Sequence, residues 1–217
     1  MTLARLFRRI HMWLGLAVGL QVVLWCASGA AMALIDRDSI AGAPAAEAAS
    51  PWPELAPVGG AVEGLTLRRL AGRPVYEVRD GGAVRLLDAA TGTALPIDAA
   101  VAEAVARRAF AIDAPVRSVA RLEEPNLEAR AHQGPMWRID FADGASSSAY
   151  VSAETGRPLV VRTDLWRAWD VAWMLHNMDY AERTSFNHPL IVLVTFVTLW
   201  LMLTGLYLLF PAFRRRR

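Results

Sequence analysis

The chain has 217 residues, of which 54% are hydrophobic and 20% charged, and its mean hydropathy is positive at +0.27. This apolar share exceeds that of an ordinary soluble domain, so the composition argues against a disordered chain and against a nucleic-acid-binding protein. The formal net charge is only +2, yet seven arginines gather at the two ends without a neighbouring acid. The single cysteine, Cys26, excludes an internal disulfide and a cysteine-based metal cluster within one chain.

Two apolar segments, residues 10–35 and 189–213, contain no charged residue. As a helix the first is about 39 Å long, which suffices to cross a bilayer with some tilt. Arginines gather in residues 1–9 and 214–217, and positive clusters remain on the cytoplasmic side of a membrane. We therefore expect two transmembrane helices, cytoplasmic termini and a central region that is periplasmic if the membrane is a bacterial inner membrane.

The first apolar segment also has features of a cleaved signal peptide, because arginines precede it and Ala31-Met32-Ala33 resembles a cleavage site. The apolar part of a signal peptide spans about 7 to 15 residues, fewer than the 26 of this segment. We therefore predict an uncleaved transmembrane helix.

Residues 36–57 are rich in alanine and proline and lack periodicity, so we interpret them as a linker. Short alternating runs with Asp-Gly turns fill residues 58–164, and such turns between alternating runs are typical of β-hairpins. Asp98 precedes an alanine-rich segment with helical spacing and is predicted to cap it. The sequence thus predicts an α+β fold, with two transmembrane helices flanking an antiparallel sheet-plus-helix domain outside the membrane.

The central region contains an internal repeat with an offset of 64 residues between Thr91 and Thr155. Each copy runs from a strand through a hairpin to a Thr-Gly pair, which we interpret as a turn that closes a strand. Two copies indicate a duplicated unit rather than a solenoid, which needs about three.

The order of strand, Asp-Gly turn, strand and D-A-x-T-G-x-x-L resembles the PepSY domain. The flanking segments resemble PepSY-associated transmembrane proteins through residues 9–16 (RIHMWLGL), Ser28-Gly29, residues 175–180 (LHNMDY) and residues 185–189 (SFNHP). Larger relatives with four helices include inner-membrane reductases of iron-siderophore complexes, which carry b-type haem between helix histidines. Soluble PepSY domains also occur in peptidase propeptides with an inhibitory role. This chain has two such helices, half the number of those relatives.

Helical spacing places a small, slightly polar stripe on one face of the first apolar helix: His11, Gly15, Val18, Val22, Cys26, Gly29 and Ala33. Because Gly15-x-x-x-Gly19 favours close approach of helices, we predict that this stripe packs against a helix of this chain or of a partner. A similar face on the second helix comprises His188, Val192, Thr195, Leu199, Met202 and Leu206. Residues 165–188 are predicted to form an interfacial amphipathic helix and turn, with one face formed by Trp166, Trp169, Trp173, His176 and Tyr180.

Three histidines, His11, His176 and His188, are candidate haem ligands, since neutral imidazole is a strong axial ligand for haem iron. His11 is expected at the cytoplasmic edge, and the other two at the outer edge, about a membrane thickness away. One chain then cannot bind one haem through His11 and either of the others. A symmetric dimer pairs His11 with its mate's copy and binds an outer haem through His176 and His188, whereas a larger complex supplies other ligands.

Simpler roles also account for these histidines, because His11 can anchor its helix among lipid headgroups and His188 can begin the second helix.

Hydrolase, phosphate-binding and nicotinamide motifs are missing from the sequence. We therefore weigh two functions. The first is an inner-membrane haem b electron-transfer protein that passes electrons toward a periplasmic acceptor such as a ferric siderophore. The second is a haem-free, membrane-anchored binding or assembly module that docks a periplasmic protein. In both, the lipid bilayer and a homo-oligomer or complex are the expected partners.

Overall fold

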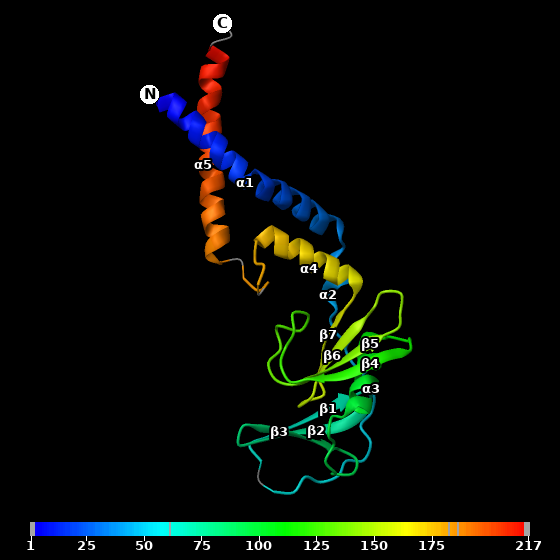
Figure 1. Ribbon diagram of the computed structural model, residues 1–217. Coiled ribbons are helices and arrows are strands. Elements are labelled where there is room, and N and C mark those ends of the chain that lie inside the picture. Colours follow the sequence, from blue (N-terminus) through cyan, green and yellow to red (C-terminus); the bar gives the residue numbers. More distant parts are fainter. Residues whose placement is uncertain (1–2, 61, 182, 186, 215–217) are drawn as a thin grey trace. The chain divides into compact units, whose positions relative to one another are not determined.

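The computed structural model describes residues 3–60, 62–181, 183–185 and 187–214 (Figure 1). It contains two compact units: a helical unit of residues 1–36 and 168–217 and a mixed unit of residues 37–167. Phe186 of the predicted SFNHP motif and the last three residues of the predicted basic tail lie outside the described residues.

Two antiparallel sheets and one helix form the mixed unit. The first sheet has the order β1-β2-β3, with β1 at Gly64–Leu70, β2 at Arg73–Asp80 and β3 at Ala83–Asp88. The second has the order β4-β5-β6-β7, with β4 at Val116–Leu122, β5 at Met136–Phe141, β6 at Ser148–Ser152 and β7 at Pro158–Arg162. The helix α3, at Ala99–Phe110, lies between the sheets in sequence. The predicted α+β class is confirmed, and each repeat corresponds to its own sheet.

Local sequence signals produce these elements as expected. Gly81 and Gly82 both have positive φ and join β2 to β3 in a two-residue turn, a conformation that favours glycine. The Asp98 carboxylate accepts a hydrogen bond from the Val101 amide at 2.9 Å and caps α3 as predicted. Gly92 and Gly156, the glycines of the repeated Thr-Gly pairs, also have positive φ and close their strands.

One hydrophobic core joins both repeats. Fully buried α3 residues such as Ala102 and Ala106 pack with Ile139 and Phe141 of the second sheet and Val75 of the first. Small alanines on α3 let the helix approach closely, so the two repeats share a core that neither sheet encloses alone.

The segment before β1, predicted as a linker, lies along the mixed unit. It begins with a short helix, α2, at Arg37–Ala41. Further along, the Ala45 amide donates to the Ala109 carbonyl and the Ala56 amide to the Ala89 carbonyl, each at 2.8 Å. These bonds hold the alanine- and proline-rich segment against the mixed unit, although the segment has no apolar periodicity. We call residues 42–57 the strap.

Two long apolar helices dominate the helical unit: α1 at Leu3–Leu34 and α5 at Pro189–Arg214. Both are long and apolar enough to cross a membrane. The Phe7 ring contacts Trp200 and Tyr207 edge-on, with centroids 6.4 and 5.7 Å apart, so the start of α1 lies beside the last half of α5. This contact places the arginine-bearing first turns of α1 near the C-terminal half of α5.

A third helix, α4, covers Asp164–Asn177 and crosses the boundary between the units. Within it, the Trp169 and Trp173 rings stack at 5.2 Å. The helix ends at Asn177 because Met178 has a positive φ of 55°. Tyr180, predicted on the same helical face as these tryptophans, therefore lies beyond the helix.

The spans contact each other through faces that differ from the predicted ones. Val192, Leu199, Met202 and Leu206 of the predicted α5 face are each about half exposed within the chain, whereas Thr204 is buried. On α1, a side chain at Gly15 or Gly19 would meet no atom within 4 Å, whereas one at Gly29 would contact His176. The small stripe of α1 thus contacts other helices of this chain through His11 at its start and through Gly29 near its far end.

Candidate functional site

Two of the candidate histidines lie in matching pockets between helices of the helical unit. At one end of the pair, His11 of α1 reaches α5, where its Nδ1 lies 2.9 Å from the Thr204 hydroxyl. At the other end, His176 of α4 reaches α1, where its Nδ1 lies 3.2 Å from the Trp25 carbonyl and 3.3 Å from the Ser28 hydroxyl. We call these the inner cradle, formed by Thr204 and Gly205, and the outer cradle, formed by Ser28 and Gly29.

The hydrogen bonds fix which ring nitrogen carries the proton. The Trp25 carbonyl can only accept, so Nδ1 of His176 must donate. The Thr204 hydroxyl lies 2.9 Å from the Trp200 carbonyl, and when it donates there its oxygen accepts from Nδ1 of His11. In this arrangement Nδ1 of each ring carries a proton, and Nε2 is left for another partner.

Each cradle also contains a glycine that makes room for the ring. A Cβ atom on Gly29 would lie 3.2 Å from Cε1 of His176, and a Cβ atom on Gly205 would lie 3.3 Å from Cε1 of His11. Both distances are tighter than ordinary packing, so any larger side chain pushes against the imidazole. A hydroxyl residue followed by glycine thus recurs on α1 and α5 with the same geometry.

The cradles are widely separated. His11 and Ser28 are 17 residues apart on one continuous helix, which corresponds to about 26 Å along its axis. The two Nε2 atoms therefore cannot bind one metal ion together, and each cradle offers a single ligand. Among the described residues, no group of three or more His, Cys, Asp or Glu side chains is arranged to hold a metal ion.

The remaining candidate, His188, is held differently. Its Nε2 lies 2.6 Å from the Asn177 carbonyl, so Nε2 carries the proton and is engaged within the chain. The His188 carbonyl accepts from the Val192 amide at the first turn of α5, which fits the predicted helix start. The structure thus brings His188 to the end of α4 but does not leave its Nε2 free.

A sequence profile described as the PepSY-associated TM region matches residues 8–217, which include both histidine cradles and the whole mixed unit. The chain belongs to the PepSY-associated transmembrane family. It is accordingly a membrane protein with two candidate spans, one near each end. No curated protein and no solved structure matches the chain.

In this PepSY-associated protein, the sequence analysis missed the hydroxyl and glycine partners on the opposite helices. Ser28 was noted only as part of a motif and Gly29 as part of that motif and of the α1 stripe, whereas Thr204-Gly205 was not predicted. The sequence did contain an indication of these partners. A Ser-Gly or Thr-Gly pair within a long apolar helix combines a hydrogen-bonding group with a small residue that lets another helix approach closely. Pairing each dipeptide with its histidine required the helix packing.

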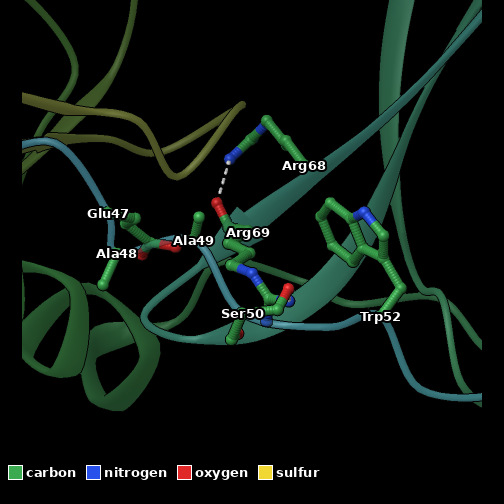
Figure 2. Close-up of a pocket in the computed structure, with 7 residues that line it drawn as sticks. All are labelled: Glu47, Ala48, Ala49, Ser50, Trp52, Arg68 and Arg69. Carbon is green, nitrogen blue, oxygen red and sulfur yellow. Dashed lines mark hydrogen bonds between the residues drawn. The ribbon is translucent and has the colours of Figure 1, made fainter.

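The mixed unit has an open pocket of about 330 Å³ where the strap crosses β1 (Figure 2). Trp52 packs under the Arg69 guanidinium, 4.3 Å from its ring centroid, and Arg69 also donates to the Ser50 and Pro51 carbonyls. Arg68 donates to the Thr155 carbonyl and to Glu77. Because both guanidinium groups already bind groups of this chain, we interpret the pocket as part of the contact that holds the strap on β1.

A strong electrostatic perturbation lies at the junction of the repeats. Glu77 is 1% exposed, and burial alone would raise its pKa. Hydrogen bonds from Arg157, Arg79 and Arg68, at 2.8 to 3.0 Å, outweigh burial and lower the pKa of Glu77 to about 2. Arg157 comes from the second repeat and the other two from the first, so this carboxylate ties the repeats together.

A second polar network lies on the second sheet. Burial raises the pKa of the Tyr150 hydroxyl, and its 2.6 Å hydrogen bond to Glu128 raises it further. Burial also opposes ionisation of Glu128, but hydrogen bonds from Arg167 and Tyr150 lower its pKa overall. Both groups thus stay in one protonation state near neutral pH and hold the β4–β5 loop on the sheet.

Proposed function

We propose that this protein is a haem b electron-transfer subunit of a membrane complex. The observation that carries the proposal is that Nδ1 of both His11 and His176 lies within hydrogen-bond distance of an oxygen on a neighbouring helix, which leaves Nε2 of each ring to bind a metal. Metal-bound histidines in proteins donate their other N–H to a carbonyl, carboxylate or similar acceptor, the arrangement found in both cradles. The donor set therefore fits one axial position of a haem at each end of the helix pair.

The second axial ligand of each haem comes from another chain in this proposal. One chain offers a single free Nε2 at each level, and low-spin b-type haem takes two axial nitrogens. A parallel two-fold dimer places like residues at the same depth, so His11 faces its mate's His11 and His176 faces its mate's His176. The open face of α1 at Gly15 and Gly19 leaves room for such a neighbour.

The described residues suggest how the chain divides its tasks. His11 and His176 bind iron, Thr204 and Ser28 hold the rings, and Gly205 and Gly29 let the rings approach the neighbouring helix. Bound haem supplies reversible one-electron transfer between the ferric and ferrous states. Two such positions, about 26 Å apart, divide a membrane crossing into shorter electron-transfer steps. We leave His188 out of the ligand set because its Nε2 already donates to Asn177.

The proposal also gives a direction for electron transfer across the membrane. Arginines flank the start of α1 and the end of α5 in the sequence, and by the positive-inside rule both of these ends are cytoplasmic in this proposal. Haem held at His11 and His176 would supply one-electron transfer from the cytoplasmic side toward a periplasmic acceptor, which a ferric siderophore represents as a one-electron oxidant. A periplasm-specific reporter inserted at residues 43–50 should be active, and one fused after residue 217 should be silent.

Absorption spectroscopy tests the haem assignment directly. The full chain is purified in detergent from cells supplied with haem and measured oxidised and after reduction with dithionite. We expect the narrow reduced α-band of a six-coordinate b-haem, lost in part in His11→Ala and in His176→Ala and absent in the double variant. His132→Ala, in a loop of the mixed unit, is the matched control and should retain the full spectrum. A colourless wild-type protein, or full haem in the double variant, would refute the assignment.

One observation favours the haem-free binding module as the second candidate. A groove of about 530 Å³ lies beside β3, between the two repeats. The Leu95 amide pairs with the Leu86 carbonyl, but Pro96 has no N–H and ends this pairing, which leaves the edge of β3 at Val84 open. An extended peptide fits such an edge by adding a strand. If the protein is colourless yet binds a periplasmic partner, and Val84→Pro abolishes that binding, this second function holds instead.

A further inference from the structure

We infer that Thr204 and Ser28 both position a histidine ring, but that they differ in how far the tautomer depends on them. The tautomer of His11 requires the Thr204 hydroxyl, whereas the tautomer of His176 does not require the Ser28 hydroxyl. The inference rests on the proposed function only in giving Nε2 an iron to bind. The tautomer itself is a property of the chain without haem. The difference between the two cradles is visible in how many acceptors each Nδ1 proton has.

The inner cradle has one acceptor for the His11 proton, the Thr204 hydroxyl oxygen at 2.9 Å. That hydroxyl is oriented by its own helix, since it lies 2.9 Å from the Trp200 carbonyl and 3.1 Å from the Leu201 carbonyl. When its proton is donated to α5, its oxygen is left to accept from Nδ1 of His11. Thr204 is 6% exposed, so water does not replace it readily.

The outer cradle has two acceptors for the His176 proton. The Ser28 hydroxyl, which donates to the Leu24 carbonyl at 2.6 Å, is one of them. The other is the Trp25 backbone carbonyl, at the slightly shorter distance of 3.2 Å. A backbone carbonyl survives any side-chain substitution, so loss of the Ser28 hydroxyl still leaves the Nδ1 proton an acceptor.

The consequence follows from the cost of an unpaired N–H in an apolar environment. Without the Thr204 hydroxyl, an Nδ1 proton on His11 would face hydrocarbon, which is unfavourable. The imidazole relieves this cost by moving its proton to Nε2 or by turning the ring toward the headgroups. In either case Nε2 no longer presents a lone pair at the original position, and the inner ligand is lost although the histidine remains.

The first measurement does not involve haem. The full-length chain is labelled with ¹⁵N-histidine, placed in lipid nanodiscs without haem, and its ring nitrogen shifts are assigned with single histidine variants. We expect wild-type His11 and His176 in the Nδ1–H form. Thr204→Val should shift His11 to a mixture or to the Nε2–H form, whereas Ser28→Ala should leave His176 in the Nδ1–H form. Thr204→Ser keeps the hydroxyl and should restore the wild-type spectrum.

A matched control exists on the same helix. Thr198 lies less than two turns before Thr204, and its buried hydroxyl oxygen has no hydrogen-bond partner among the described residues. Thr198→Val therefore removes the same atoms from α5 without touching a cradle, and both histidine tautomers should be unchanged. An unaltered His11 tautomer in Thr204→Val would overturn the inference, as would a shift of equal size in Thr198→Val.

Haem titration of the same variants measures the consequence for iron binding. Thr204→Val should weaken the inner haem site by about 10- to 100-fold, the usual effect of removing a histidine's hydrogen-bond partner, and Ser28→Ala should change the outer site much less. A wild-type chain that binds no haem while His11 shows the expected tautomer shift would refute the proposed function and keep this inference. Haem binding at wild-type strength in Thr204→Val would refute the inference and keep the function.

Discussion

The histidine cradles of the helical unit and the repeat junction of the mixed unit bury polar groups in different ways. In the cradles, imidazole nitrogens contact hydroxyl groups and a backbone carbonyl on a neighbouring helix. At the junction of the repeats, the mixed unit instead buries an ionised carboxylate, Glu77, against three arginines. Both arrangements satisfy every hydrogen-bonding atom they use, but only one of them depends on charge.

The solvent around each unit explains the difference. A charge within a bilayer is costly, so helices that face lipid join through neutral donors and acceptors. The mixed unit has water within reach, and Arg79 and Arg157 keep more than half of their side chains exposed while their ends contact Glu77. We therefore expect charge-removing changes to act on the mixed unit and steric changes to act on the helical unit.

The largest expected effect is that of Glu77→Gln. It leaves three arginines around a neutral group, and breaking a buried ion pair by removing one partner costs about 3 to 5 kcal/mol of unfolding free energy. Urea unfolding of the full chain in non-ionic detergent, followed by circular dichroism, measures the loss. Glu103→Gln is the control, because Glu103 forms a half-exposed pair with Arg107 on α3 worth less than about 1 kcal/mol. Equal losses in the two variants would contradict the junction role of Glu77.

The second prediction is the pH dependence of the unfolding free energy that Glu77 causes. Its pKa is lowered in the folded protein from 4.5 to about 2, so the unfolded chain binds the proton more readily. The contribution to stability is complete above the unfolded pKa and is lost as the pH falls from about 4.5 toward 2. The loss amounts to at most about 3 kcal/mol, and less because Arg79 and Arg157 are partly exposed. Thermal unfolding of Glu77→Gln should lack this part of the pH profile; an identical profile would show that other carboxylates cause it.

Steric changes in the helical unit should discriminate between its glycines. Gly205→Leu and Gly29→Leu place a side chain against His11 and His176, and such overpacking costs about 1 to 3 kcal/mol. Gly15→Leu is the matched control, because nothing in the chain lies within 4 Å of a side chain there. Resistance to thermal aggregation in detergent measures all three. If Gly15→Leu alone also abolishes cross-linking between copies, the open face of α1 packs against a second chain.

The sequence predicts most of the fold but only half of each cradle. Strands, turns and the α3 cap follow from alternation, Asp-Gly and Asp98, since these signals act over a few residues. His11 and His176 stand out because ionisable groups are rare in apolar helices. Their partners did not stand out in the sequence. Thr204 and Ser28 lie 193 and 148 residues from their histidines and contact them only through helix packing. The α5 face was mispredicted for the same reason: in an almost wholly apolar helix, periodicity carries little information.

The smallest effect tests the local signal that the sequence predicted best. Asp98→Ala removes the acceptor of the Val101 amide at the start of α3, and loss of such a cap costs about 1 kcal/mol. Because α3 packs on both sheets through Ala102 and Ala106, the loss should appear in the cooperative unfolding of the whole mixed unit. Asp113→Ala, an exposed loop carboxylate after α3, is the control and should stay within about 0.5 kcal/mol of wild type. A separate early transition confined to helical signal would mean that α3 unfolds on its own and that the shared core does not couple the repeats.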